Sequence, residues 1–175
     1  MGQSNLDRNA GLRYGSSRGI GRGIAIALAS AGYDVAVTYH GEKEEGEEVA
    51  HVIEKEYGRK CVLLQASLER ADVAVETVKK SVEGLGRLDV LVNNAGLTKT
   101  APIDELSDDT LELLLGLNYR AYLLCAREAS KIMIRDGIKG NIVSITSSRG
   151  TRAYPGDAVY GGLKAAIERS TESMA

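Results

Sequence analysis

The chain has no phenylalanine and no tryptophan among its 175 residues. Its core must therefore be packed from leucine, isoleucine, valine and alanine, with 8 tyrosines as the aromatic side chains. The two cysteines, Cys61 and Cys125, lie in apolar runs, which predicts core thiols in a reducing compartment. The sequence also lacks a patterned set of Cys and His ligands, so we expect no metal site.

Long apolar runs and a dominant charge are lacking as well. No run approaches the ~18 apolar residues that span a bilayer, and "MGQSNLDRNAG" at the start is too polar for a secretory signal. The net charge is −2, and the 22 basic and 24 acidic residues form no basic stripe. We therefore expect a cytoplasmic protein without membrane or nucleic-acid partners. The length predicts a single domain over residues 1–175.

Short apolar, β-branched segments alternate with longer helical ones along the chain. The predicted strands are 34–39, 61–66, 88–93 and 141–146, and the predicted helices are 22–32, 44–58, 71–86, 107–137 and 155–175. Strand followed by helix, repeated, predicts a parallel sheet with helices on both faces, because the crossover connections are right-handed. The predicted fold class is therefore α/β, a doubly wound parallel sheet.

A glycine-rich stretch, "YGSSRGIGRG" (14–23), leads directly into the first predicted helix. Gly15, Gly19 and Gly21 allow the backbone to approach a diphosphate closely. The helix start near Ile20 offers unpaired N–H groups and the positive end of the helix dipole. Alone, this G-x3-G-x-G spacing is as typical of a structural turn as of a nucleotide site.

A second motif, "NNAG" (93–96), closes a predicted strand. In doubly wound sheets, ligands bind beyond the carboxyl ends of the strands, where these residues lie. Taken alone, an Asn-Asn pair that forms a turn is the simpler interpretation.

The third motif joins a strand end to a helix start. Ser147 follows the strand "NIVSIT", and thirteen residues later Tyr160 begins "YGGLK", with Lys164 one helical turn further on. Residues four apart share a helix face. An ammonium nearby lowers the pKa of a phenol from ~10 toward the range of efficient proton transfer, and Ser147 can donate a hydrogen bond to a substrate oxygen. The alternative is a chance pair on a surface helix.

In this order and spacing, the motifs resemble short-chain dehydrogenases/reductases over nearly the whole chain from about Gly15. The resemblance is carried by "GSSRGIG", "NNAG", Asn118 in "GLNYRAY", Ser147 in "ITSSRG", and "YGGLK". It implies a Rossmann-type fold and hydride transfer between a nicotinamide dinucleotide and a small-molecule carbonyl or secondary alcohol. A 3-oxoacyl thioester reductase and a glucose-type sugar dehydrogenase are both compatible. The resemblance also implies homodimers or homotetramers that pair through 107–137 and 155–175.

The resemblance further implies roles for single residues. Tyr160 would be the general acid in the reducing direction, and Lys164 would tune Tyr160 and bind the nicotinamide ribose. Ser147 would orient the carbonyl, and Asn118 would support a water that relays protons to Lys164. Asn93 would lie beside the adenosine ribose. The implied cofactor-binding residues are Gly15, Ser17, Arg18, Gly19, Ile20, Gly21, Tyr39, His40, Ser67, Asn94, Ala95, Gly96, Tyr160 and Lys164.

The end of the second predicted strand favours NADP over NAD. An NAD site would place an acidic residue there, to bind the ribose 2′-hydroxyl. The residues present are Thr38, Tyr39 and His40, none of them acidic. Arg18 lies in the glycine-rich stretch, where the resemblance implies a cation for the 2′-phosphate, and guanidinium groups suit phosphate.

The start of the chain departs from the family pattern. The first strand should be a continuous apolar run, but "NAGLRY" (9–14) places Arg13 where Val or Leu is expected. Either this strand is short and distorted, or residues 1–13 fold differently from the family. Tyr14 replaces a small threonine and would crowd the glycine-rich turn. Ser67 replaces an aspartate that faces the adenine, which predicts weaker adenine contacts.

The chain ends at "ERSTESMA" (168–175), part-way along the helix that begins near Tyr160. We expect it to belong to a longer protein and to lack the last strands and the substrate lid, so the sequence does not predict the substrate. Two alternatives to a reductase stay open. One is a catalytically inactive dinucleotide-binding or oligomer-forming relic, favoured by the atypical first strand. The other is a sugar-nucleotide epimerase, which shares the Tyr-x3-Lys pair but has a longer glycine spacing.

Overall fold

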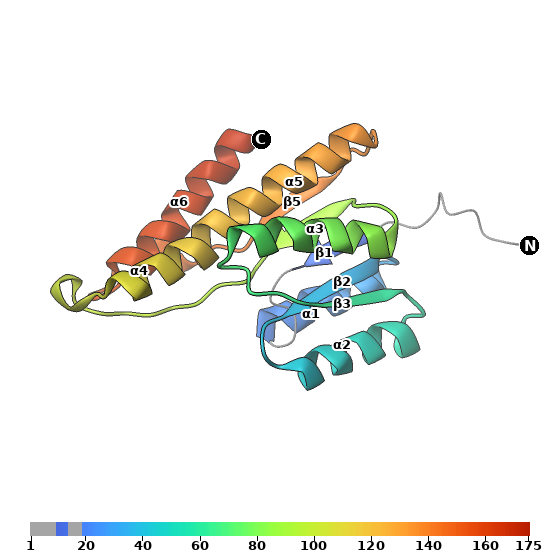
Figure 1. Ribbon diagram of the computed structural model, residues 1–175, viewed down its shortest axis with the longest axis horizontal. Coiled ribbons are helices and arrows are strands. Elements are labelled where there is room, and N and C mark those ends of the chain that lie inside the picture. The colour runs from blue at the N-terminus through green and yellow to red at the C-terminus, as the bar shows by residue number, and fades with distance from the viewer. Residues whose placement is uncertain (1–9, 14–18) are drawn as a thin grey trace, which may run out of the picture.

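The computed structural model describes residues 10–13 and 19–175, with the backbone only for Leu12 and Arg13. Within this part of the chain, one parallel sheet has the strand order β3-β2-β1-β4-β5 (Figure 1). The strands are β1 (Ala10–Arg13), β2 (Asp34–Tyr39), β3 (Cys61–Gln65), β4 (Val90–Asn93) and β5 (Asn141–Ser144). The chain moves outward from β1 to β3 and then crosses to β4 on the other side of β1. This reversal is the Rossmann-type, doubly wound arrangement, so the predicted fold class is confirmed.

The helices follow the predicted segments, with one interruption. They are α1 (Gly19–Ser30), α2 (Lys43–Glu56), α3 (Ala71–Leu85), α4 (Asp108–Leu115), α5 (Ala121–Arg135) and α6 (Ala158–Met174). A π-helical turn, Gly116–Arg120, joins α4 to α5, where the sequence predicted one continuous helix. Short 3-10 turns lie at Ile103–Glu105 and Ser148–Gly150. Within the described ranges, no helix is both long and apolar enough to cross a bilayer.

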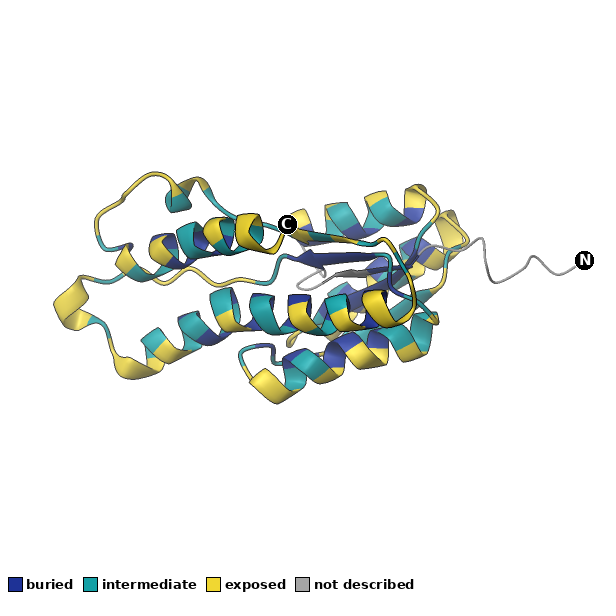
Figure 2. Ribbon diagram, turned by 90° about the horizontal axis from the view of Figure 1, so that it is seen from above, coloured by how far each residue is buried: buried dark blue, intermediate teal, exposed yellow. Residues whose placement is uncertain are grey.

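Two apolar clusters hold the helices on the two faces of the sheet. Val35 and Val37 of β2 pack with α1 and α2 on one face. Ala36, which lies between them and points to the opposite face, packs in the larger cluster with Leu91 of β4 and residues of α3 and α5. Figure 2 shows the buried residues concentrated in the central strands and on the inner sides of these helices. Cys125 is buried within the larger cluster, and neither it nor Cys61 forms a disulfide.

The first strand is short, but its pairing is regular. Gly11 pairs with Val35 of β2 on one side and with Val90 of β4 on the other. A Cβ atom at Gly11 would lie 3.2 Å from Leu28 Cδ1, so glycine at this position lets α1 pack closely on the centre of the sheet. Of the two expectations for this region, the structure has the short strand. It lies in the family's central position.

Candidate active site

Lys164 lies in the second turn of α6 and is only 3% exposed. Its Nζ donates hydrogen bonds to the carbonyl oxygen of Ile145 at 2.9 Å and to the hydroxyl of Tyr122 at 3.2 Å. Ile145 directly follows β5, so the amine is fixed at the carboxyl end of the sheet. Burial lowers the pKa of Lys164 from 10.5 to about 8. The amine can therefore change its charge close to neutral pH.

Tyr160 lies one helical turn before Lys164 on α6, and the structure places the two side chains together. Lys164 Nζ is 5.7 Å from the centroid of the Tyr160 ring. This is within the range of a cation–π contact. Because Lys164 is buried, the pair is not the chance surface pair that the spacing alone allowed.

Asn118 lies in the π-helical turn and is fully buried. Its Nδ2 donates to the carbonyl oxygens of Leu97 at 3.0 Å and Leu114 at 3.2 Å, and its Oδ1 accepts from the Leu97 amide at 3.1 Å. The side chain thus ties the loop after β4 to the junction of α4 and α5. Turns of this π type are frequent at functional sites.

Gly96 brings the loop after β4 between Asn118 and Lys164. A Cβ atom at this position would lie 2.8 Å from Asn118 Oδ1 and 3.6 Å from Lys164 Nζ. The first distance is shorter than a carbon–oxygen contact allows, so a side chain would force Asn118 or the loop to move. The "NNAG" turn therefore lies directly beside the Lys164 amine.

Ser147 begins the 3-10 turn that follows β5, and its Oγ accepts a hydrogen bond from the Arg149 amide at 3.2 Å. The Arg149 guanidinium forms an ion pair with Asp157 at 3.1 Å, and the Asp157 side chain is only 2% exposed. Asp157 directly precedes α6. A Cβ atom at Gly161 would lie 2.8 Å from the Arg149 carbonyl oxygen, so the turn and the helix pack against each other without space for a side chain. The ion pair and this contact fix Ser147 relative to the helix of Tyr160.

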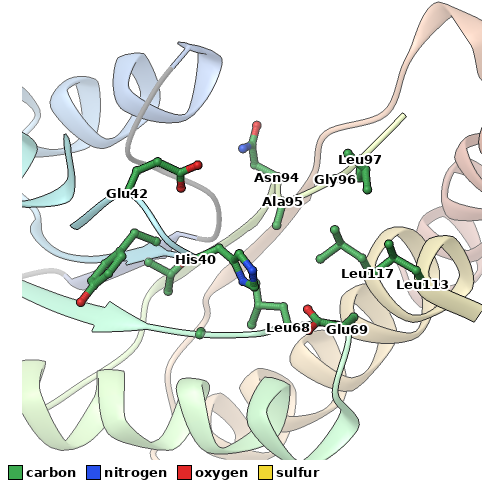
Figure 3. A pocket seen from close by; sticks show the side chains of 13 residues that line it. His40, Glu42, Leu68, Glu69, Asn94, Ala95, Gly96, Leu97, Leu113 and Leu117 are labelled. Carbon is green, nitrogen blue, oxygen red and sulfur yellow. The ribbon is translucent and has the colours of Figure 1, made fainter. Parts of the chain in front are cut away.

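A cavity of about 470 Å³ lies beyond the carboxyl ends of β2 and β4. This volume is typical of small-molecule sites. Its described lining comprises Thr38, Tyr39, His40, Glu42, Ala66, Leu68, Glu69, Asn94, Ala95, Gly96, Leu97, Leu113 and Leu117. Figure 3 shows His40 and Glu42, which follow β2, across the cavity from Leu113 and Leu117.

The cavity brings together five of the residues predicted to bind the cofactor: Tyr39, His40, Asn94, Ala95 and Gly96. Ser67 is not part of the described lining, although its neighbours Ala66 and Leu68 are. Two carboxylates that the sequence reasoning did not assign, Glu42 and Glu69, also line it.

The glycine-rich turn is described in part. Gly15, Ser17 and Arg18 lie outside the described residues. Gly19 begins α1 with a φ of +56°, a conformation that suits glycine. Ile20 is exposed beside it, and Gly21 is buried. The positive end of α1 therefore begins at the predicted diphosphate-binding residues.

Three residues around the site were missed by the sequence reasoning: Tyr122, Arg149 and Asp157. Tyr122 lies four residues after Asn118, a spacing that places both on one side of a helix, but no motif singles it out. Arg149 and Asp157 belong to a stretch that reads as a generic loop. The described residues contain no group of three or more His, Cys, Asp or Glu side chains arranged to hold a metal ion.

The chain is similar in sequence to known proteins. A family profile described as short chain dehydrogenase matches residues 12–175. The chain is 36% identical over 164 residues to a 3-oxoacyl-[acyl-carrier-protein] reductase of Staphylococcus epidermidis, covering 94% of this chain and 66% of the relative. It is 35% identical over 170 residues to the hydroxynaphthalene reductase arp2 of Aspergillus fumigatus, covering 97% and 61%. The chain thus spans about two thirds of the length of these relatives.

Solved structures give the same result. A short chain dehydrogenase from Burkholderia cenocepacia, crystallised in complex with NADP, superposes with a TM-score of 0.88 at 34% identity, covering 95% of this chain and 66% of that one. The acetoin dehydrogenase of Enterobacter cloacae superposes with a TM-score of 0.91 at 30% identity and the same coverage. From its sequence match and its fold together, the chain belongs to the short-chain dehydrogenase/reductase family.

Proposed function

We propose that this chain carries the catalytic centre of an oxidoreductase that transfers hydride between NADP(H) and a carbonyl or secondary alcohol. The observation that carries the proposal is the buried Lys164 amine beside Tyr160, next to a cavity at the strand ends. A proton donor and a place for a flat cofactor thereby meet at one edge of the sheet. Family membership supports the same reaction class.

The chain's own residues supply proton transfer and orientation. In reduction, the Tyr160 hydroxyl gives its proton to the carbonyl oxygen, and the Lys164 ammonium stabilises the phenolate that results. Ser147 donates a hydrogen bond that orients the carbonyl. Asn118 holds the loop after β4 in place. The nicotinamide cofactor, when bound, supplies the hydride that the carbonyl carbon accepts.

The described residues fit a dinucleotide along the strand ends. Gly19 and Ile20 would hold the diphosphate at the start of α1, and the cavity around His40 and Ala95 would hold the adenosine. NADP is supported by the lack of an acidic residue at Thr38 to His40 and by the NADP bound in the Burkholderia structure. Glu42 in the cavity lining favours NAD as the second candidate, because its carboxylate would repel a 2′-phosphate.

The test of the reaction is the variant Tyr160→Phe, with Tyr57→Phe as the matched control in an exposed position at the end of α2. With a panel of carbonyl substrates, we expect Tyr160→Phe to lower NADPH oxidation roughly 10²- to 10⁴-fold, the usual contribution of a general acid. Fluorescence titration should show unchanged NADPH binding. Tyr57→Phe should behave as the unmodified protein.

Three outcomes would count against this reading. Turnover retained in Tyr160→Phe would refute the role of Tyr160. NADPH binding without turnover of any carbonyl by the unmodified chain would favour the inactive dinucleotide-binding alternative. Equal or better binding of NADH than of NADPH would assign the cofactor to NAD.

We also propose that the protein is cytoplasmic and that it associates with itself through 107–137, which contains α4 and α5, and through α6. Ile134 of α5 is 80% exposed and Met174 of α6 is 52% exposed, which leaves apolar side chains on both helices available for a second copy. Light scattering during size-exclusion chromatography should give the mass of a dimer or tetramer. A monomer at micromolar concentration would contradict this part of the proposal.

A further inference from the structure

A second tyrosine, on a different helix from Tyr160, contacts the Lys164 amine. Tyr122, in the first turn of α5, is 3% exposed and accepts the 3.2 Å hydrogen bond from Lys164 Nζ. The same Nζ lies 4.9 Å from the centroid of the Tyr122 ring. The amine therefore lies close to two tyrosine rings, of which only that of Tyr160 belongs to its own helix.

Tyr122 is itself fixed to the ends of two strands. Its backbone carbonyl accepts from Asn93 Nδ2 at 3.3 Å, at the last residue of β4. Its hydroxyl is 3.4 Å from the carbonyl oxygen of Ile145, which follows β5, and donates to it. The hydroxyl of Tyr122, the carbonyl of Ile145 and the amine of Lys164 thus form a closed group of three mutual contacts.

The hydrogen bonds of the ammonium leave one direction open. A lysine ammonium has three N–H donors. Ile145 and Tyr122 accept two of them, and neither acceptor lies on α6. With one donor engaged by Ile145 after β5 and one by Tyr122 of α5, one N–H is left, and the centroid of the Tyr160 ring lies 5.7 Å from the same nitrogen.

We propose that Tyr122 is a positioning residue for the reaction, whose hydroxyl holds the Lys164 amine so that its third N–H is directed toward Tyr160 and the cofactor. The proposal rests on the proposed function, because it concerns the same centre. Tyr122 does not reach the reacting atoms and acts through Lys164. An aromatic residue of the same shape without the hydroxyl would fill the core equally well but would not hold the amine.

Removing the hydroxyl should have a defined effect on Lys164. The titratable groups that face the amine are Tyr122 from α5 and Tyr160 from α6, whereas the sheet contributes the carbonyl of Ile145 and the loop after β4 contributes Gly96 next to Asn118. An acceptor that contacts the ammonium favours its charged form. The variant Tyr122→Phe should therefore lower the pKa of Lys164 below about 8.

The experiment compares Tyr122→Phe with the matched control Tyr119→Phe. Tyr119 lies three residues earlier and also bonds to α6, with its hydroxyl 3.1 Å from Ser170 Oγ, but it does not contact Lys164. In full-length chain labelled with 13C-lysine, NMR titration follows the Lys164 amine, and Lys164→Met assigns the signal. We expect the Lys164 pKa to fall by roughly 0.5 to 1 unit in Tyr122→Phe, the effect of one hydrogen bond, and to stay unchanged in Tyr119→Phe.

A second readout is the pH profile of kcat for alcohol oxidation, which needs the charged amine. Its alkaline limit should move to lower pH by the same amount in Tyr122→Phe, and should not move in Tyr119→Phe. A purely structural role of Tyr122 would lower the stability of Tyr122→Phe and leave its pH profile in place. Thermal unfolding verifies that each variant is folded.

The outcomes separate this inference from the proposed function. An unmoved Lys164 titration and pH profile in an active enzyme would overturn the role of Tyr122 alone. A moved titration in a protein that converts no alcohol or carbonyl would support the contact between Tyr122 and Lys164. It would overturn the proposed reaction, and with it the catalytic purpose of the contact.

Discussion

The cavity around His40 and the centre around Lys164 lie at the same edge of one sheet, on either side of Gly96, but they are built from different kinds of contacts. In the cavity, His40 and Gly96 are exposed, and a bond such as that from Gln65 Nε2 to the His40 carbonyl, at 3.0 Å, lies at the surface. Around Lys164, the side chains of Asn118, Tyr122 and Lys164 itself are buried. The side chains of Asn118 and Lys164 each form two or more hydrogen bonds.

The difference matches two physical requirements. A cofactor that enters and leaves needs a preformed but accessible surface, which backbone turns and apolar side chains provide. Proton transfer needs donor and acceptor held within a fraction of an ångström, which requires locked side chains. Buried polar groups give that rigidity only when their hydrogen bonds are satisfied. Substitutions should therefore cost far more stability around Lys164 than in the cavity.

The largest expected effect comes from Asn118→Ala compared with His40→Ala. Removing the Asn118 amide deletes three hydrogen bonds and leaves the backbone groups of Leu97 and the Leu114 carbonyl without this partner. We expect the free energy of unfolding to fall by about 2–4 kcal/mol, because unsatisfied buried groups are costly. His40→Ala, at an exposed position, should change it by less than about 0.5 kcal/mol. Urea unfolding of both variants measures these changes in free energy, and equal losses would contradict the difference between the two regions.

A second effect concerns the charge of Lys164 and has a defined sign. The pKa of Lys164 is about 8 in the folded protein, against 10.5 as its ordinary value. Between these pH values the unfolded chain binds a proton that the folded chain has lost, so the free energy of unfolding rises with pH. Relative to Lys164→Met, the unmodified protein should therefore gain up to about 3 kcal/mol as the pH rises from 7 to 10.5.

The control for this measurement is Lys131→Met, at an exposed lysine of α5. Compared with Lys131→Met, the unmodified protein should show no gain in the free energy of unfolding between these pH values when both are unfolded with urea. If the difference in the free energy of unfolding between the unmodified protein and Lys164→Met also stayed constant with pH, the Lys164 amine would not be desolvated in the folded protein. That result would contradict the contrast between the buried centre and the accessible cavity.

The smallest effect distinguishes two neighbouring glycines of α6. A Cβ atom at Gly161 would meet the Arg149 carbonyl oxygen at 2.8 Å. One at Gly162 would meet no described atom within 4 Å, apart from its chain neighbours and the backbone of its own helix. Gly161→Ala should destabilise the protein by about 1–3 kcal/mol through overpacking. Gly162→Ala should stabilise it by about 0.5–1 kcal/mol through helix propensity. Opposite shifts of the melting temperature in the two variants would support the close contact between Gly161 and the Arg149 carbonyl, and shifts of the same sign would contradict it.

Much of the fold follows from local sequence pattern, and the differences lie near the site. β2 has the predicted bounds, 34–39, and its central residues 35–37 are apolar and buried, as expected for a strand covered on both faces. β5 ends at Ser144 rather than at 146, and the carbonyl of Ile145, directly after it, accepts a hydrogen bond from Lys164. The predicted helix 107–137 is divided by a π-helical turn. The π turn shifts the apolar period by only about one residue at one place, which is too small a change to recognise in the pattern of this segment.

The site was predictable where the chemistry is local and not where it depends on tertiary contacts. Tyr160 and Lys164 are four residues apart on one helix, and their spacing alone places them together. Tyr122 meets Lys164 across 42 positions of the chain, and no local signal encodes that contact. The roles assigned to Ser147 and Asn118 stay predictions until variants are measured. So do those of Gly15, Ser17 and Arg18, which lie outside the described residues.

The π-helical turn at 116–120 determines the phase between two helices. The Ala121 amide donates to the Gly116 carbonyl, five residues back, so this turn holds more residues than an α-helical one. If the same residues formed a regular α-helix instead, the extra residue would rotate α4 by about 100° relative to α5. Tyr122 would keep its side toward Lys164, but α4 would turn a different side toward α6. The wider turn therefore determines which side of α4 packs on α6 while α5 keeps Tyr122 beside Lys164.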